Sequence, residues 1–283
     1  MQTPVIDCHV HLNHYADENQ DRLSHSLDDL RTTMRRNRVD AAIILTSYKD
    51  VPGRPSTRAV VEAVKDEPHL HVVAGLSFER FNQHTIDELD DLLAHRKIVG
   101  LKLYPGYEPF YPYDEKLEPA YALAAKYGVP VMIHCGDTYT PKGKVKYAHP
   151  LHVDELAVDH PEVNFVICHL GNPWLRDCME VVYKNANVYA DFSGLVLGNF
   201  SDRFEKYMRE QMQELLLYGM SPDNVLYGTD WPISTMESYL AFVEDLKVPL
   251  ADRRKMMYEN TAKLFRIPIP SGSPGIGGLF GRR

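Results

Sequence analysis

The sequence predicts an α/β protein built as a (β/α)8 TIM barrel, and three observations lead to this fold class. Short apolar runs alternate with amphipathic stretches from Val5 to Phe265, a length close to the roughly 250 residues of a usual barrel. Most runs are continuous and rich in β-branched residues, which is typical of parallel strands covered by helices. A doubly wound sheet shows the same alternation, but its glycine-rich fingerprint is missing after the first run, where His-Val-His-Leu-Asn stands.

The apolar runs give the expected strands in chain order. Each run is too short for a typical helix, and most end at a polar or turn-forming residue. We expect strands over Val5–His11, Ala41–Thr46, His71–Phe78, Val99–Tyr104, Pro130–Gly136, Asn164–Gly171, Val188–Gly194 and Asn224–Asp230.

The stretches between the runs have helical spacing of apolar residues. Several begin with a residue that favours a helix start, such as Ser56, Pro150 or Pro173. We expect helices over Leu23–Asn37, Thr57–Asp66, Thr85–Ala94, Asp114–Tyr127, Pro150–Asp159, Pro173–Lys184 and Asp202–Tyr218, with closing helices over Glu237–Leu246 and Ala251–Phe265.

One domain over residues 1–266 accounts for this pattern. Residues 267–283 are rich in Gly, Pro and Ser, and we expect them to form an extended C-terminal tail. Such a tail either wraps a neighbouring subunit or remains mobile.

The composition is that of an ordinary globular protein, with 44% hydrophobic and 25% charged residues. A net charge of -8 argues against a nucleic-acid-binding protein but leaves binding of a small carboxylate open. The chain has no apolar run of about 18 residues and no basic stretch followed by an apolar one, so we expect a cytoplasmic protein without a membrane segment. Four cysteines are too few for a disulfide scaffold.

Five titratable residues close four of the expected strands: His9, His11, His134, His169 and Asp230. Successive side chains of a strand point to opposite faces, so His9 and His11 share a face. Catalytic groups of such barrels sit at the carboxyl ends of the strands. Burying one of these groups unpaired costs several kcal/mol. The set therefore indicates mutual pairing or a divalent metal ion.

The same alternation makes a prediction for three thiols beside these histidines. If the histidines face the site, Cys8, Cys135 and Cys168 face the other way. We expect them to be small buried residues packed under helices, and not metal ligands.

The chain resembles the amidohydrolase superfamily, and more closely its amidohydrolase-related branch with the aminocarboxymuconate-semialdehyde decarboxylase-like enzymes. The resemblance covers nearly the whole chain and rests on Ile6-Asp7-Cys8-His9-Val10-His11, Gly100-Leu101-Lys102-Leu103-Tyr104-Pro105, His134, His169-Leu170-Gly171, Gly228-Thr229-Asp230-Trp231-Pro232 and Asn260-Thr261-Ala262-Lys263-Leu264-Phe265. It implies a TIM barrel, a divalent ion that is usually zinc, and a homodimer.

The resemblance also implies roles for the five residues. His9, His11, His134 and Asp230 would bind the metal, and His169 would be the nearby acid or base, or a ligand of a second metal. Three imidazoles and one carboxylate leave a position open for water, as a catalytic zinc requires, and Mn²⁺ is an alternative ion. Such a water has a pKa of about 7, and Asp230 is expected to accept its proton.

Lys102 shares a strand face with Tyr104 at the end of the fourth strand, and both are expected to contact substrate. Three roles are open for Lys102: a side chain extending to the barrel mouth, a cation for a substrate carboxylate or carbonyl, or a carbamylated bridge between two metals. Asp7 shares strand parity with His9, so it is expected either to support a ligand or to make a structural hydrogen bond.

These observations favour a metal-dependent hydrolase acting on a C–O or C–N bond of a small molecule, such as a lactone, cyclic amide or ester. The alternative is a metal-dependent decarboxylase or hydratase of an aromatic or dicarboxylic acid, which would need an arginine for the carboxylate. Arg54, Arg58 and Arg80, in or near loops, are candidates for that arginine. A barrel that only binds a ligand is the third interpretation.

Overall fold

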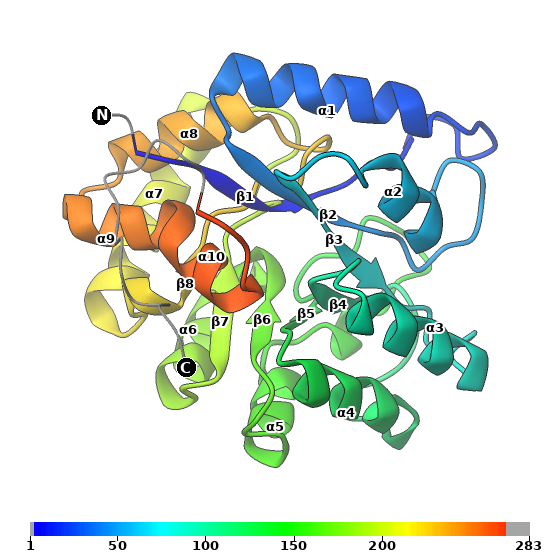
Figure 1. Ribbon diagram of the computed structural model, residues 1–283. Helices are drawn as coiled ribbons and strands as arrows, with labels where there is room; N and C mark the ends of the chain where they lie inside the picture. Colours follow the sequence, from blue (N-terminus) through cyan, green and yellow to red (C-terminus); the bar gives the residue numbers. More distant parts are fainter. Residues whose placement is uncertain (1–2, 270–283) are drawn as a thin grey trace, which may run out of the picture.

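Eight parallel strands form one sheet in the chain order β1 to β8, with helices around its outside (Figure 1). The structure is a computed structural model that describes residues 3–269. The predicted (β/α)8 barrel is therefore confirmed. Of the expected tail, Ile267 is buried against the barrel, and residues 270–283 lie outside the described residues.

Each expected strand is present. The strands are β1 Ile6–Val10, β2 Ala41–Leu45, β3 Leu70–Gly75, β4 Gly100–Leu103, β5 Val131–Ile133, β6 Phe165–Ile167, β7 Val188–Asp191 and β8 Val225–Leu226. Several end earlier than predicted, most clearly β6 and β8. His169 and Asp230 have φ values of 61° and 65°, in the left-handed region, which cannot continue a strand.

The helices also follow the predicted order. They are α1 Leu23–Asn37, α2 Thr57–Ala63, α3 Gln83–Ala94, α4 Glu118–Tyr127, α5 Leu151–Asp159, α6 Leu175–Lys184, α7 Asp202–Tyr218, α8 Met236–Asp245, α9 Leu250–Arg254 and α10 Asn260–Phe265. Short 3-10 turns lie at η1 Glu115–Leu117, η2 Val145–Tyr147, η3 Cys168–Gly171 and η4 Pro222–Asn224, and the π-helical η5 Lys255–Glu259 joins α9 to α10. None of the described helices is both long and apolar enough to cross a bilayer.

Apolar stripes attach the helices to the barrel. Helix α1 buries Leu27, Leu30 and Met34, which recur at the spacing of one helix face. Ser56 begins α2 as predicted, because its side chain accepts a hydrogen bond from the backbone of Ala59. Each fully buried apolar side chain contributes about 1.5–3 kcal/mol relative to an exposed one, so these stripes hold the helices in place.

Backbone hydrogen bonds between the first and last strand segments close the barrel. The amide of His11 donates to the carbonyl of Trp231 at 2.7 Å, and the amide of Asp230 donates to the carbonyl of His9 at 2.8 Å. Closure therefore places Asp230 next to His9 and His11, although nearly the whole barrel sequence separates Asp230 from these two histidines.

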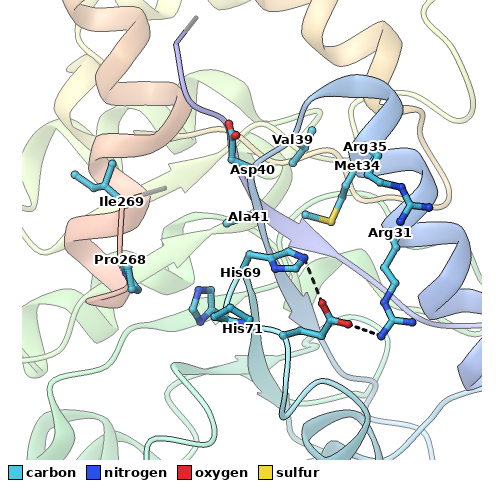
Figure 2. Close-up of a pocket in the computed structure, with 12 residues that line it drawn as sticks. Arg31, Met34, Arg35, Val39, Asp40, Ala41, His69, His71, Pro268 and Ile269 are labelled. Atoms are coloured by element: carbon cyan, nitrogen blue, oxygen red, sulfur yellow. Dashed lines mark hydrogen bonds and ion pairs between the residues drawn. The ribbon is translucent and has the colours of Figure 1, made fainter. Parts of the chain in front are cut away.

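The amino-terminal end of the barrel carries a cavity of about 750 Å³ beside the starts of β2 and β3 (Figure 2). Three of its titratable side chains, Arg31, Glu67 and His69, form one group. Glu67 accepts from Arg31 at 2.5 Å and lies 3.5 Å from His69. The predicted catalytic residues all lie at the opposite, carboxyl-terminal end.

Candidate metal centre

A second cavity, of about 720 Å³, opens at the carboxyl ends of the strands. Every residue predicted to belong to the site lines it: His9, His11, Lys102, Tyr104, His134, His169 and Asp230. This is the end of the barrel where the predicted site was expected.

The hydrogen bonds of His11 determine which of its nitrogens can bind a metal. Its Nδ1 lies 2.7 Å from the carbonyl oxygen of Leu45, and a carbonyl only accepts, so Nδ1 carries the proton. The Nε2 lone pair then faces Oδ1 of Asp230 at 3.2 Å. Two acceptors at this distance repel each other unless a proton or a metal cation lies between them. This pair therefore fits a metal ion.

The ring of His9 is also held at Nδ1 and directs its Nε2 toward Asp230. Its Nδ1 lies 3.0 Å from Oδ2 of Asp191, and its Nε2 lies 3.8 Å from Oδ1 of Asp230. The ligand atoms of His9, His11 and Asp230 lie within 4.8 Å of one another, and all three residues are buried. Two imidazoles and a carboxylate are a donor set that suits a divalent transition metal.

The charge states suit metal binding too. Burial lowers the pKa of His11, so its ring is neutral at pH 7. Burial by itself would raise the pKa of Asp230, but the polar contacts with the surrounding rings of His11, His9 and His169 hold it well below its usual value. The site thus presents the neutral imidazole of His11 beside an ionised carboxylate, the forms in which these groups bind metals.

His134 lies in the same cavity but outside this group of three. Its ring centre is 5.1 Å from that of His169, and its Nε2 lies 3.0 Å from the backbone carbonyl of Asp137. Burial lowers its pKa well below the usual value, so it is also neutral. Its role as a fourth ligand stays a prediction.

His169 is held so that one ring nitrogen faces the cavity. Its Nδ1 lies 3.1 Å from the carbonyl oxygen and 2.9 Å from Oγ of Ser193. Because the carbonyl only accepts, Nδ1 carries a proton and Nε2 has a free lone pair. Burial lowers the pKa of His169 to about 4, so at neutral pH it is a base.

Asp191 and Ser193 are the site residues that the sequence prediction missed. Asp191 is fully buried and accepts from Nδ1 of His9, the amide of His169 and the amide and hydroxyl of Ser193. Burial alone would raise its pKa, but His9 and these hydrogen bonds keep it far below the usual value. Asp191 ends β7, much as His11, His134 and His169 closely follow the ends of other strands, and this signal was present in the sequence.

The structure corrects two expectations about the barrel interior. Lys102 is only 1% exposed and its Nζ lies 2.6 Å from Sγ of Cys168, so the side chain does not extend to the barrel mouth. Cys168 therefore faces the interior and not the helices. The physical reason is that β6 ends at Ile167, and strand alternation no longer applies in the following 3-10 turn.

Tyr104 and Asp7 are both held by backbone groups. The Tyr104 hydroxyl donates to the carbonyl of Thr46 at 2.5 Å, and its ring lies 5.4 Å from Nζ of Lys102. Asp7 accepts from the amides of His9 and Thr229, each at 3.1 Å, and also from the Thr229 hydroxyl at 2.6 Å, but not from an imidazole. Of the two roles expected for Asp7, the structure therefore supports the structural hydrogen bond. Substrate contact by Lys102 and Tyr104 stays a prediction.

Aromatic and charged residues form the mouth of the cavity: Tyr15, Tyr48, Tyr107, Tyr139, Glu18, Lys49, Arg54 and Lys142. Of the three candidate arginines, only Arg54 lines the cavity. Its Nε donates to Glu18 at 2.9 Å, and its guanidinium lies 4.1 Å over the ring of Tyr15. Arg58 instead pairs with Glu88 on the outer helices.

Known structures share this architecture. An uncharacterized TIM-barrel protein from Bordetella bronchiseptica is 19% identical, with 93% of this chain and 98% of that one covered and a TM-score of 0.74. A dihydroxybenzoic acid decarboxylase from Polaromonas sp. JS666, solved with manganese and 2-nitroresorcinol, is 16% identical over 94% and 97%, with a TM-score of 0.65. A probable 2-pyrone-4,6-dicarboxylic acid hydrolase from Acinetobacter baumannii, solved with citric acid, is 15% identical over 93% and 99%, with a TM-score of 0.66.

At these identities the structural similarity shows the fold alone. No curated protein matches the sequence. The model of the amidohydrolase family, however, matches residues 6–267, which is almost all of the described chain. The chain therefore belongs to the amidohydrolase family of metal-dependent enzymes.

Proposed function

We propose that the protein hydrolyses a C–O or C–N bond of a small anionic molecule, such as a lactone, a cyclic amide or an ester. The observation that carries this proposal is the Nε2 lone pair of His11 facing Oδ1 of Asp230 at 3.2 Å inside a cavity at the carboxyl ends of the strands. That arrangement calls for a cation, and hydrolysis is the reaction that a metal with an open position supports most directly.

We assign the metal to His9, His11, His134 and Asp230, with one Zn²⁺ as the simplest occupant. Joining the group would require His134 to give up its contact with the Asp137 carbonyl. Mn²⁺ is the alternative, since one similar solved structure contains manganese. A second ion would need Lys102 or His169 as further ligands.

When bound, the metal would polarise the substrate carbonyl and acidify a water molecule. The protein's own residues then handle protons and position. Asp230 accepts a proton from the attacking water through its carboxylate. His169, with its free Nε2, receives that proton and delivers it to the leaving oxygen or nitrogen. Tyr104 is fixed to Thr46 and forms part of the wall against which the substrate lies.

The charge of the site favours an anionic substrate. The buried carboxylates of Asp191 and Asp230 carry two negative charges, which a divalent ion would balance. The cations Lys49, Arg54 and Lys142 line the cavity and outnumber the carboxylates of Glu18 and Asp137. An anion balances this charge, and low-dielectric surroundings strengthen the attraction.

Decarboxylation is the second candidate, and the position of Arg54 favours it. Such a reaction needs a cation for the substrate carboxylate, and Arg54 lines the cavity. Its guanidinium is already hydrogen-bonded to Glu18, which also accepts from Lys49 at 3.0 Å. The two cations exceed the single carboxylate in charge, so this part of the wall still attracts an anion.

The test begins with metal content per chain, measured by plasma mass spectrometry on protein purified without added metal or chelator. About one ion per chain, lost in Asp230→Asn, supports the assigned site, and about two would move Lys102 and His169 into the metal shell. Lactones, cyclic amides and carboxylates are then screened for acid release and for CO2 release, which separates the two reactions. No metal, and none bound on reconstitution, would refute both candidates.

A further inference from the structure

Lys102, which lines the cavity, pairs with the buried Cys168, and the sulfur of this cysteine has no role in the proposed reaction. Lys102 Nζ lies 2.6 Å from Cys168 Sγ, and the two residues are 1% and 0% exposed. A typical N–H···O bond is about 2.9 Å long, and sulfur is a larger atom than oxygen, so this contact is unusually close. Within residues 3–269, Cys168 is the only hydrogen-bond partner of Nζ.

We propose that hydrogen peroxide converts this pair into a reversible covalent cross-link, in which one oxygen atom bridges Nζ of Lys102 and Sγ of Cys168. Two single bonds that meet at a bent oxygen span a distance close to the one that already separates the two atoms. A direct S–N bond is much shorter and would pull both side chains through a closely packed core. The geometry therefore favours the oxygen bridge.

The bridge forms in two oxidations that consume two molecules of peroxide. In the first, Sγ takes one oxygen from peroxide, the thiol becomes a sulfenic acid, and water leaves. In the second, the sulfenic oxygen forms a bond to Nζ. The sulfenic hydrogen and one hydrogen of the Nζ amine are removed by the second peroxide, which becomes two waters. Sulfur and nitrogen each lose two electrons. Two molecules of dithiothreitol supply four electrons and restore the amine, the thiol and one water.

Proximity, and not thiol acidity, makes the pair selective. Burial raises the pKa of Cys168, as it does for the other buried thiols of Cys8, Cys135 and Cys178. Only Cys168 among them has a lysine nitrogen hydrogen-bonded to sulfur within the described residues. Reacting groups held in place gain a large effective concentration, and Lys102 lines the cavity, which gives a small oxidant its route.

The experiment exposes metal-loaded protein to hydrogen peroxide, digests it without reductant and measures peptide masses. We expect a linked peptide pair containing Lys102 and Cys168, one oxygen heavier and two hydrogens lighter than the sum, which disappears after dithiothreitol. Full recovery of the free Lys102 peptide, or Cys168 found only as sulfinic or sulfonic acid, would overturn the proposal. A linked pair without the added oxygen would refute the bridge as drawn.

Matched variants locate the link. Lys102→Arg and Cys168→Ser are expected to abolish it, whereas Cys135→Ser, which removes another buried thiol, is expected to leave it unchanged. A variant that fails to fold does not affect the measurement on the wild-type protein, where the peptides of Cys8 and Cys135 are internal controls. Because the readout is a mass, the outcome does not depend on whether the proposed hydrolysis is correct.

Discussion

Replacing Asp191 with Asn tests whether this carboxylate controls the metal site without touching the metal. Asp191 accepts hydrogen bonds at both oxygens, from Nδ1 of His9 on Oδ2 and from Ser193 and His169 on Oδ1. An amide keeps one acceptor and replaces the other with a donor. Whichever way the amide turns, a donor faces either the His9 ring or the donors around Ser193.

The expected result is weaker metal binding. If the amide NH2 faces His9, the proton moves to Nε2 and the lone pair that binds the metal is lost. Outer residues of this kind typically contribute 10–100-fold to metal affinity, or about 1.4–2.7 kcal/mol. The affinity is measured by competition with a chromophoric chelator. The control is Asp154→Asn, because Asp154 accepts from Lys184 and Asn185 away from the cavity. Equal affinities for Asp191→Asn and wild type would refute the reasoning.

Three further predictions follow from individual contacts. Ser193→Ala is expected to lower kcat about tenfold or more at unchanged metal content, because His169 loses one of its two Nδ1 acceptors. Ser193→Thr keeps the hydroxyl and is expected to restore most of the activity. An equal loss of kcat in the buried control Ser234→Ala would contradict this role. Arg54→Gln is expected to raise KM for an anionic substrate about tenfold with little change in kcat in steady-state kinetics, because Arg54 lines the cavity. An unchanged KM would show that Arg54 does not bind the substrate. Burial lowers the pKa of His71 from 6.5 to about 4, so the unfolded state binds more protons in that range and stability is lost as pH falls from 6.5 to 4. In urea unfolding, the free energy of unfolding of His71→Asn should fall by about 2–3 kcal/mol less than that of the wild type between pH 6.5 and 4. The exposed control His84→Gln should show the same fall as the wild type.

The fold was predictable because its signals are local and repeated. Each strand of a parallel barrel is buried on both faces, so it appears as a continuous apolar run such as Ala41–Leu45. Each helix shows one apolar face, as α1 does. The boundaries were less predictable, since a run of apolar letters does not reveal where backbone hydrogen bonding stops. Thus β5 and β6 are shorter than the apolar stretches that contain them.

The sequence predicted which residues lie near the carboxyl ends of the strands, and therefore which side chains come close together. His9, His11 and Asp230 converge because barrel closure joins β1 to the segment after β8. Which way a side chain points beyond the strand end depends on a few dihedral angles, and there the alternation rule fails. The left-handed φ of His169 turns its ring toward Ser193, and the preceding turn brings Cys168 to Lys102 inside the barrel. Residues that orient the ligands are therefore found from donor and acceptor geometry, and the sequence identifies only the strand ends at which to look.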